Sequence, residues 1–196
     1  MPSAKTVNLD THAMATLRYI RDSMDAAGGV AVPGSAGIAM GIVGLAATGL
    51  SLHLATHWFV IWLAAAPIAV TAGALLMAHS ASVVSFIGAG KPGRKLLLGL
   101  IPSLFAGAVM TAVLWKADYL GAAPGVWLLL YGCALVSASA FTKVIVRWMG
   151  ACFVALGVLA LLAPPASQIP LLGVGFGGLH IIFGVLIARG AHAQQS

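Results

Sequence analysis

Long apolar runs alternate with short polar gaps along most of the chain, beginning near residue 32. Six of these runs reach the roughly 20 residues that a helix needs to cross about 30 Å of hydrocarbon. The pattern therefore predicts an all-α, polytopic integral membrane protein, a bundle of six transmembrane helices joined by short loops. The expected spans cover residues 32–52, 57–79, 96–115, 122–141, 144–163 and 169–188. Whether residues 80–90 continue the second helix stays open, because apolar character persists to residue 87.

The first 30 residues differ from the rest, because charged and polar side chains interrupt them. Residues 10–27 predict a short amphipathic helix, in which Met14, Leu17, Ile20 and Met24 share one face, which lies either at the membrane surface or against cytoplasmic loops of the same protein. A charged start without a following apolar run does not match a secretory signal peptide. The expected organisation is a cytoplasmic segment (1–30), a six-helix transmembrane domain (31–189) and a short cytoplasmic tail (190–196).

The ten Lys and Arg residues occur only where apolar runs stop, and they concentrate in every second gap. This alternation is the positive-inside signature, and it predicts that both termini face the cytoplasm. We expect a multi-pass protein of a plasma membrane, the bacterial inner membrane, with the bilayer as its first partner. Five cations are expected to bind lipid headgroups and fix the topology: Lys91, Arg94, Lys95, Lys143 and Arg147. Because the cations are divided among short segments, the net charge of +6 does not indicate nucleic-acid binding.

Acidic residues are nearly absent, and this restricts the possible functions. The chain has no Glu, and its four Asp residues (10, 22, 25 and 118) all lie outside the expected spans. Cation-coupled carriers usually depend on an ionisable group inside the membrane. No acid stands beside a buried base to form a catalytic constellation. The chain is therefore expected not to be an enzyme, and no metal site is predicted.

Small residues form ridges on most of the spans. Gly34, Gly37, Gly41 and Gly44 recur in the first span at three- and four-residue spacing, and Gly173, Gly177 and Gly184 mark the sixth. Such ridges let helix backbones approach closely, which drives association in lipid. One interpretation is a seam with a second copy or with other membrane subunits, and the other is packing inside one bundle. The first interpretation gives the leading hypothesis, a non-catalytic structural or accessory component.

His180 is the one titratable side chain expected near the middle of the membrane. It is a candidate to bind a ligand, coordinate haem iron or carry a proton; otherwise it is a neutral ring bonded to Ser137, Tyr131 or a carbonyl. A second hypothesis is a carrier or pore for a small neutral or hydrophobic solute, lined by Thr71, Ser103, Thr111, Ser137 and His180. A haem-binding redox subunit is the third. Bis-histidine ligation is disfavoured, because His79, His180 and the pair His53 and His57 lie at three different depths, and a haem with a methionine as the second ligand stays open.

Overall fold

The computed structural model describes residues 14, 16–17, 33–80, 92–142 and 144–192, and within these ranges every regular element is a helix. Six of the helical stretches are long and apolar enough to cross a membrane, which confirms the predicted all-helical class and the number of spans. Their length and hydropathy indicate a multi-pass membrane protein. The predicted amphipathic helix, the extension over residues 81–90 and most of the tail lie outside the described residues.

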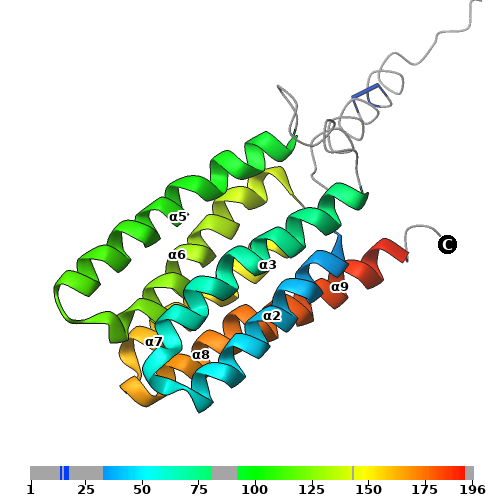
Figure 1. Cartoon of the computed structure of the whole chain (residues 1–196). Coiled ribbons are helices and arrows are strands. Elements are labelled where there is room, and N and C mark those ends of the chain that lie inside the picture. The colour runs from blue at the N-terminus through cyan, green and yellow to red at the C-terminus, as the bar shows by residue number, and fades with distance from the viewer. Residues whose placement is uncertain (1–13, 15, 18–32, 81–91, 143, 193–196) are drawn as a thin grey trace, which may run out of the picture.

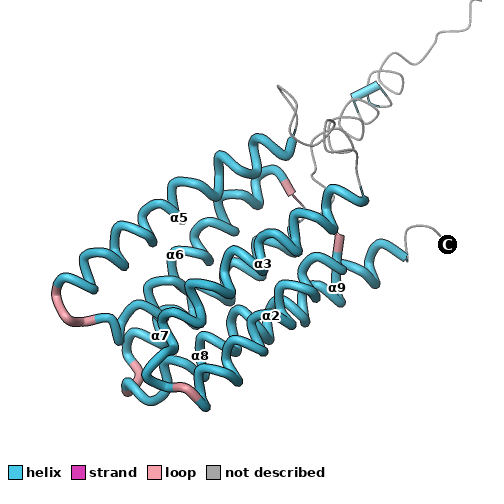
Figure 2. The backbone as a smooth tube through the Cα atoms, in the orientation of Figure 1, coloured by secondary structure: helices cyan, strands magenta, loops and turns pink. Residues whose placement is uncertain are grey.

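Short loops join antiparallel neighbours (Figures 1 and 2). The α-helices are α2 (Gly34–His53), α3 (Trp58–Ser80), α5 (Pro92–Lys116), α6 (Ala123–Ala138), α7 (Val144–Leu162), α8 (Gln168–Gly173) and α9 (His180–His192). The 3-10 turns are η1 (Ala55–His57), η2 (Leu120–Ala122), η3 (Ser139–Phe141) and η4 (Pro165–Ser167), and η5 (Val174–Leu179) is π-helical.

Two boundaries differ from the prediction. The apolar span Leu98–Lys116 agrees with the predicted third span, but its helix begins earlier, at Pro92, because proline fits the first turn of a helix, where its missing N–H is not needed. The sixth span is one continuous rod of α8, η5 and α9, in which the π-helical segment was not predicted. A π-helix inside an α-helix is rare and commonly occurs at functional sites.

The helices form two groups, and α8 and η5 connect them. Helix α2 packs along α3 and α9, while α6 packs along α5 and α7. We call the end of the bundle at which α2, α5 and α7 begin the cationic end, since Arg147 and Arg189 lie there. The opposite end, where Trp58, Trp115 and Trp127 lie, is called the aromatic end.

The glycine ridge of α2 faces the sixth span of the same chain. A Cβ atom added at Gly44 would lie 2.7 Å from the carbonyl oxygen of Phe176, and one at Gly41 would lie 2.8 Å from that of Gly177. One added at Gly184 would meet the Gly34 oxygen at 2.8 Å. The two backbones therefore touch without side chains between them, a contact that gives strong dispersion attraction in lipid. The glycine ridges that suggested a contact with another chain thus form a contact between two spans of the same chain.

A second close contact joins α6 and α7. A Cβ at Gly132 would lie 2.8 Å from the Gly150 oxygen, and one at Gly150 would lie 2.9 Å from the Gly132 oxygen. Next to this contact, Leu128, Phe153 and Leu172 are fully buried and connect α6, α7 and α8. Interdigitated side chains thus fill the centre of the bundle between these helices.

Candidate functional site

His180 lies in the core, where its ring is only 3% exposed. Its Nε2 atom is 2.8 Å from the hydroxyl oxygen of Tyr131 on α6, one of the partners that the sequence suggested. The ring stacks on Phe176, with ring centroids 6.0 Å apart and planes 15° apart, and meets Phe153 edge-on at 5.3 Å. His180 therefore sits in an aromatic cluster and connects the sixth span to α6.

The other ring nitrogen of His180, Nδ1, has no hydrogen-bond partner among the residues that the structure describes. The carbonyl groups of Gly175 and Phe176, one turn earlier, interact with the ring, but neither reaches hydrogen-bond geometry with Nδ1. Trp62 Nε1 is also buried without a partner among the described residues, and its ring contacts Phe176. Buried polar groups without a hydrogen-bond partner are uncommon in native proteins, and this part of the core holds two of them.

The Tyr131–His180 bond leads to a stability prediction. Tyr131→Phe removes the hydrogen bond to Nε2 and leaves a second ring nitrogen buried without a partner among the described residues, which costs about 1–3 kcal/mol. Thermal unfolding in mild detergent measures the effect. Tyr119→Phe is the matched control, because Tyr119 is 67% exposed. Equal melting temperatures for the two variants would show that the bond contributes nothing.

The five predicted solute-lining residues do not line one path. Ser137 and Thr71 are exposed, and each lies nearly opposite a packed position on its own helix. Thr111 donates to the Gly107 carbonyl at 2.7 Å and accepts a hydrogen bond from Trp127 Nε1, also at 2.7 Å. Ser103, on α5, is partly buried. These positions give no support to a polar passage that includes His180.

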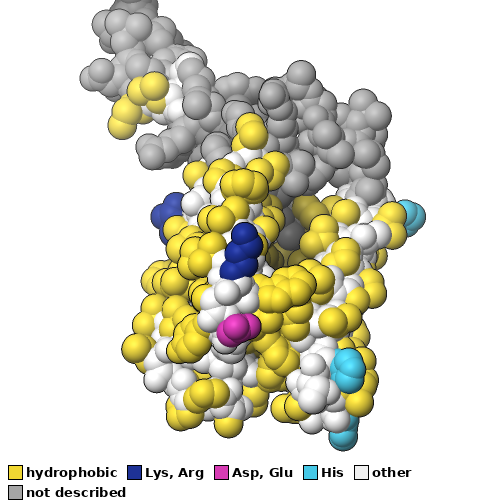
Figure 3. Space-filling model, turned by 60° about the vertical axis from the view of Figure 1, so that its left-hand side comes forward, with side chains coloured by type: hydrophobic (Ala, Val, Ile, Leu, Met, Phe, Trp, Pro, Cys, Tyr) yellow, Lys and Arg dark blue, Asp and Glu magenta, His cyan; other side chains and the backbone are white. Residues whose placement is uncertain are grey.

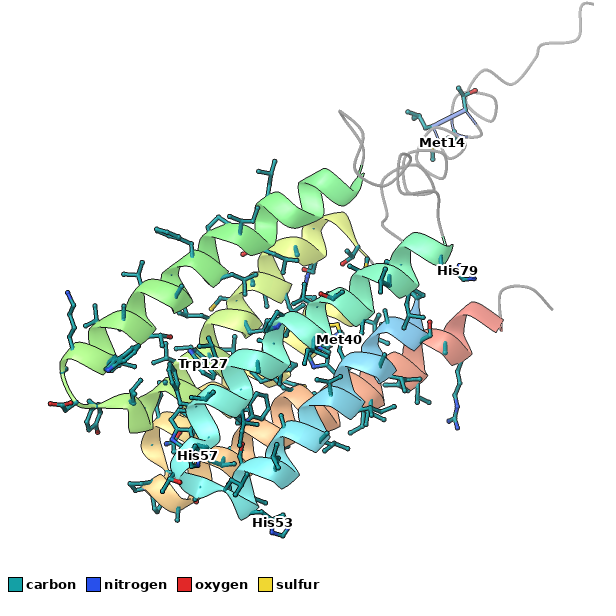
Figure 4. All side chains as sticks on the ribbon, viewed as in Figure 1. Met14, Met40, His53, His57, His79 and Trp127 are labelled. Carbon is teal, nitrogen blue, oxygen red and sulfur yellow. The ribbon has the colours of Figure 1, made fainter. Side chains whose placement is uncertain are left out.

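The structure also gives no support to the haem hypothesis. The Nε2 atom of His180 is held by Tyr131, and aromatic rings cover the imidazole. Figure 4 places His53 and His57 at the aromatic end and His79 at the cationic end, at different depths as expected. Within the described ranges, no group of three or more His, Cys, Asp or Glu side chains is positioned to hold a metal ion.

A cleft between α3 and α5 was not predicted. Helix α3 packs along α2 and α5 packs along α6, whereas α3 and α5 make no comparably extended contact with each other. Figure 1 shows α6 between them, and the space-filling view in Figure 3 shows a hollow between two apolar ridges on this side. Among the α5 residues with described side chains, only Gly107 is buried. The third span is therefore attached to the bundle along a single edge.

Aromatic rings close the cleft at the aromatic end. Phe59 of α3 touches Trp115 of α5 at 6.0 Å and Trp127 of α6 at 6.1 Å, measured between ring centroids. Trp58 lies 6.1 Å from the same Trp127 ring. The hydrogen bond from Trp127 to Thr111 holds these rings against α5. The three helices are thus joined at this end, whereas α3 and α5 make no comparably extended contact along their lengths.

The walls of the cleft follow from helix geometry. An α-helix turns by about 100° per residue, so side chains on α3 can be compared by their direction around the helix axis. Ala66, Val70 and Met77 point within about 20° of the direction of Phe59. On α5, Leu104 and Ala108 point within the same angle, about 20°, of the direction of Trp115. Val70 is 61% and Leu104 is 49% exposed, so these walls do not cover each other. Tyr131 lies on the face of α6 that carries Trp127, and this face forms the floor, although Ala134 on it is fully buried. The ring of Tyr131 packs in the core against Phe153 and Phe176, and its hydroxyl bonds His180 behind this face.

Comparison with known proteins does not identify the chain. No family model, curated protein or solved structure matches it. The function therefore has to be argued from the chain itself.

Proposed function

We propose that this chain is a non-catalytic membrane protein that binds a hydrophobic, membrane-resident molecule in the cleft between α3 and α5. The observation that carries the proposal is the separation of these two helices beside a closed aromatic end. This develops the second sequence hypothesis, a carrier for a hydrophobic solute, and replaces its polar lining with an apolar one. His180 and Tyr131 then act behind the floor of the cleft and not as ligands of a polar solute.

The dimensions of the cleft favour a linear hydrocarbon tail as the occupant. From Ala66 to Met77 the open wall of α3 extends about 16 Å, at 1.5 Å per residue. One leaflet contributes about 15 Å of hydrocarbon to a bilayer. The walls are apolar, since they consist of Ala, Val, Leu and Met side chains. A single acyl-like chain therefore matches the cleft in length and polarity.

The same proposal includes an orientation. Arg147 and Arg189 lie at the cationic end, whereas Lys116 at the other end is close in sequence to Asp118. This distribution supports a cytoplasmic cationic end with both termini inside, in a bacterial inner membrane. The cleft then opens into the cytoplasmic leaflet. Labelling of single cysteines placed at either end of the bundle, with a reagent that does not cross membranes, tests the orientation.

Native mass spectrometry of the protein extracted in mild detergent tests the proposal. We expect a protomer or homo-oligomer that retains a small hydrophobic molecule. A defined set of other membrane polypeptides, with no retained small molecule, would favour the leading sequence hypothesis of an accessory subunit. In that case a helix of the partner would occupy the cleft, because the glycine ridges of α2 and the sixth span already pack against each other. A bare protomer would contradict both proposals.

A further inference from the structure

Tyr131 and His180 form a pair in which a phenol lies beside a base. The Tyr131 hydroxyl oxygen is 2.8 Å from Nε2 of the buried imidazole. The carbonyl groups of Gly175 and Phe176 interact with the same ring, and Nδ1 is the ring nitrogen nearer to the backbone. Because carbonyl oxygens only accept hydrogen bonds, they favour the tautomer that carries its proton on Nδ1. Nε2 is then the acceptor, and the Tyr131 hydroxyl donates to it.

The surroundings of the pair suit a one-electron oxidation. Phe153 and Phe176 contact both rings, with ring centroids 4.9–6.0 Å apart. A phenol that loses an electron becomes a strong acid, and in apolar surroundings it needs a base within hydrogen-bond distance to take its proton. His180 Nε2 is such a base. The carbonyl groups of Gly175 and Phe176 would then face the imidazolium and stabilise its charge.

Two tryptophans connect this pair with the aromatic end. Trp127 is four residues before Tyr131 on α6, so the two side chains lie on the same face of the helix. The Trp127 ring is 6.1 Å from that of Trp58, measured between ring centroids. Trp58 begins α3 and is partly exposed. Indole and phenol rings are among the side chains that lose one electron most readily, so three oxidisable rings lead from the bundle surface to a base.

We propose that Tyr131 donates one electron to a lipid peroxyl radical at the aromatic end while its hydroxyl proton moves to His180. The electron leaves through Trp127 and Trp58. The peroxyl radical takes up this electron and a proton from interfacial water, and it becomes a lipid hydroperoxide. Tyr131 becomes a neutral phenoxyl radical beside the His180 imidazolium, so each chain consumes one radical.

The position of Trp58 selects a lipid radical as the oxidant. Trp58 begins a helix that is long and apolar enough to cross a membrane, and indole rings at the ends of such helices lie at the level of the headgroups. Peroxyl groups of oxidised acyl chains are polar and move toward the same level. The inference uses the aromatic rings of the core and does not depend on an occupant of the cleft.

The test uses the full chain in vesicles of polyunsaturated phosphatidylcholine with a lipid-soluble azo initiator, which produces peroxyl radicals inside the bilayer. Electron paramagnetic resonance of rapidly frozen samples should show a phenoxyl radical, whose spectrum narrows when the tyrosines are ring-deuterated. Tyr131→Phe should abolish this signal, whereas Tyr119→Phe, at a 67% exposed site, should retain it. His180→Gln should lower the phenoxyl yield at least about tenfold, since a positioned base contributes a factor of about 10²–10⁴.

Trp58→Phe tests the electron path without changing the pair. It keeps an aromatic ring but one that is hard to oxidise, so the phenoxyl yield should also fall at least about tenfold. Because Trp58 is partly exposed, this variant serves as the test if His180→Gln does not fold. Trp148→Phe is the matched control, since its ring is 66% exposed near the start of α7, at the cationic end. The yield in this variant should equal that of wild type.

Each contrary outcome removes a named part of the inference. Absence of a phenoxyl signal in wild type, or its persistence in Tyr131→Phe, would overturn the role of Tyr131. Equal yields in His180→Gln and wild type would show that His180 does not accept the proton, and an equal loss in Trp58→Phe and Trp148→Phe would remove the path. A signal with a water-soluble initiator alone would assign the oxidant to the aqueous phase and overturn the lipid radical.

Discussion

Replacing Gly44 with alanine is expected to destabilise the bundle by about 1–3 kcal/mol, the usual cost of adding an atom to a close-packed contact. The new Cβ would lie 2.7 Å from both the carbonyl carbon and the oxygen of Phe176. Backbone atoms of a neighbouring helix cannot rotate away as a flexible side chain does. Helices α2 and η5 would have to separate, which weakens the adjacent contacts of Gly41 and Gly184.

Gly49→Ala is the matched control on the same helix. Nothing lies within 4 Å of a Cβ at this position. Because alanine is the better helix former, this variant should be neutral or stabilised by up to about 1 kcal/mol. Chemical or thermal unfolding in detergent, followed by circular dichroism, compares the two variants. If both change stability by the same amount, the α2 contact with the sixth span is not a backbone contact and the helix arrangement is wrong.

Val70→Trp is expected to reduce the retained hydrophobic molecule by about tenfold or more, which corresponds to about 1.4 kcal/mol or more of binding free energy. The indole ring would extend from α3 toward Leu104 and fill the space between the walls. Folding should be unaffected, because Val70 is 61% exposed and buries little surface in the bundle. Quantitative lipid analysis of the purified protein measures the retained molecule.

Ile68→Trp provides the control for this change. Ile68 is 58% exposed, and it lies about 200° around α3 from Val70, on the opposite face. The same large side chain is thus introduced at nearly the same depth outside the cleft. Retention in Ile68→Trp should equal that of wild type. A similar loss in both variants would mean that the retained molecule belongs to the general lipid shell.

The number of spans was predictable because hydropathy records each crossing directly. The glycine ridge of α2 predicted a close contact as well, but the sequence left its partner open. The contact of Gly41 with Gly177 depends on which helices become neighbours, and a one-dimensional pattern does not contain that information. Tyr131 stood among the possible partners of His180 for the same reason, and the structure shows which of them makes the bond.

The structure gives no support to the prediction where polar type was taken to indicate an interior position. Thr71 is two residues from Gly73, which packs against Met40, and it therefore faces the other way. The angular position of Thr71 around the helix, compared with that of the small residues, would have revealed this. The cleft gave no sequence signal, because apolar walls around a gap have the same composition as a surface that faces lipid.

The most direct test of the central claim is to find where a hydrocarbon chain contacts the protein. Phospholipids that carry a photoactivatable diazirine in the acyl chain are reconstituted with the wild-type protein, and the labelled residues are located by mass spectrometry. We predict that adducts concentrate on the cleft walls, at Val70 and Leu104, and exceed those at Ile68 and Leu75, which are equally exposed on the opposite side of α3. Uniform labelling of all exposed apolar positions would contradict the account, because it would show that the cleft holds no bound chain.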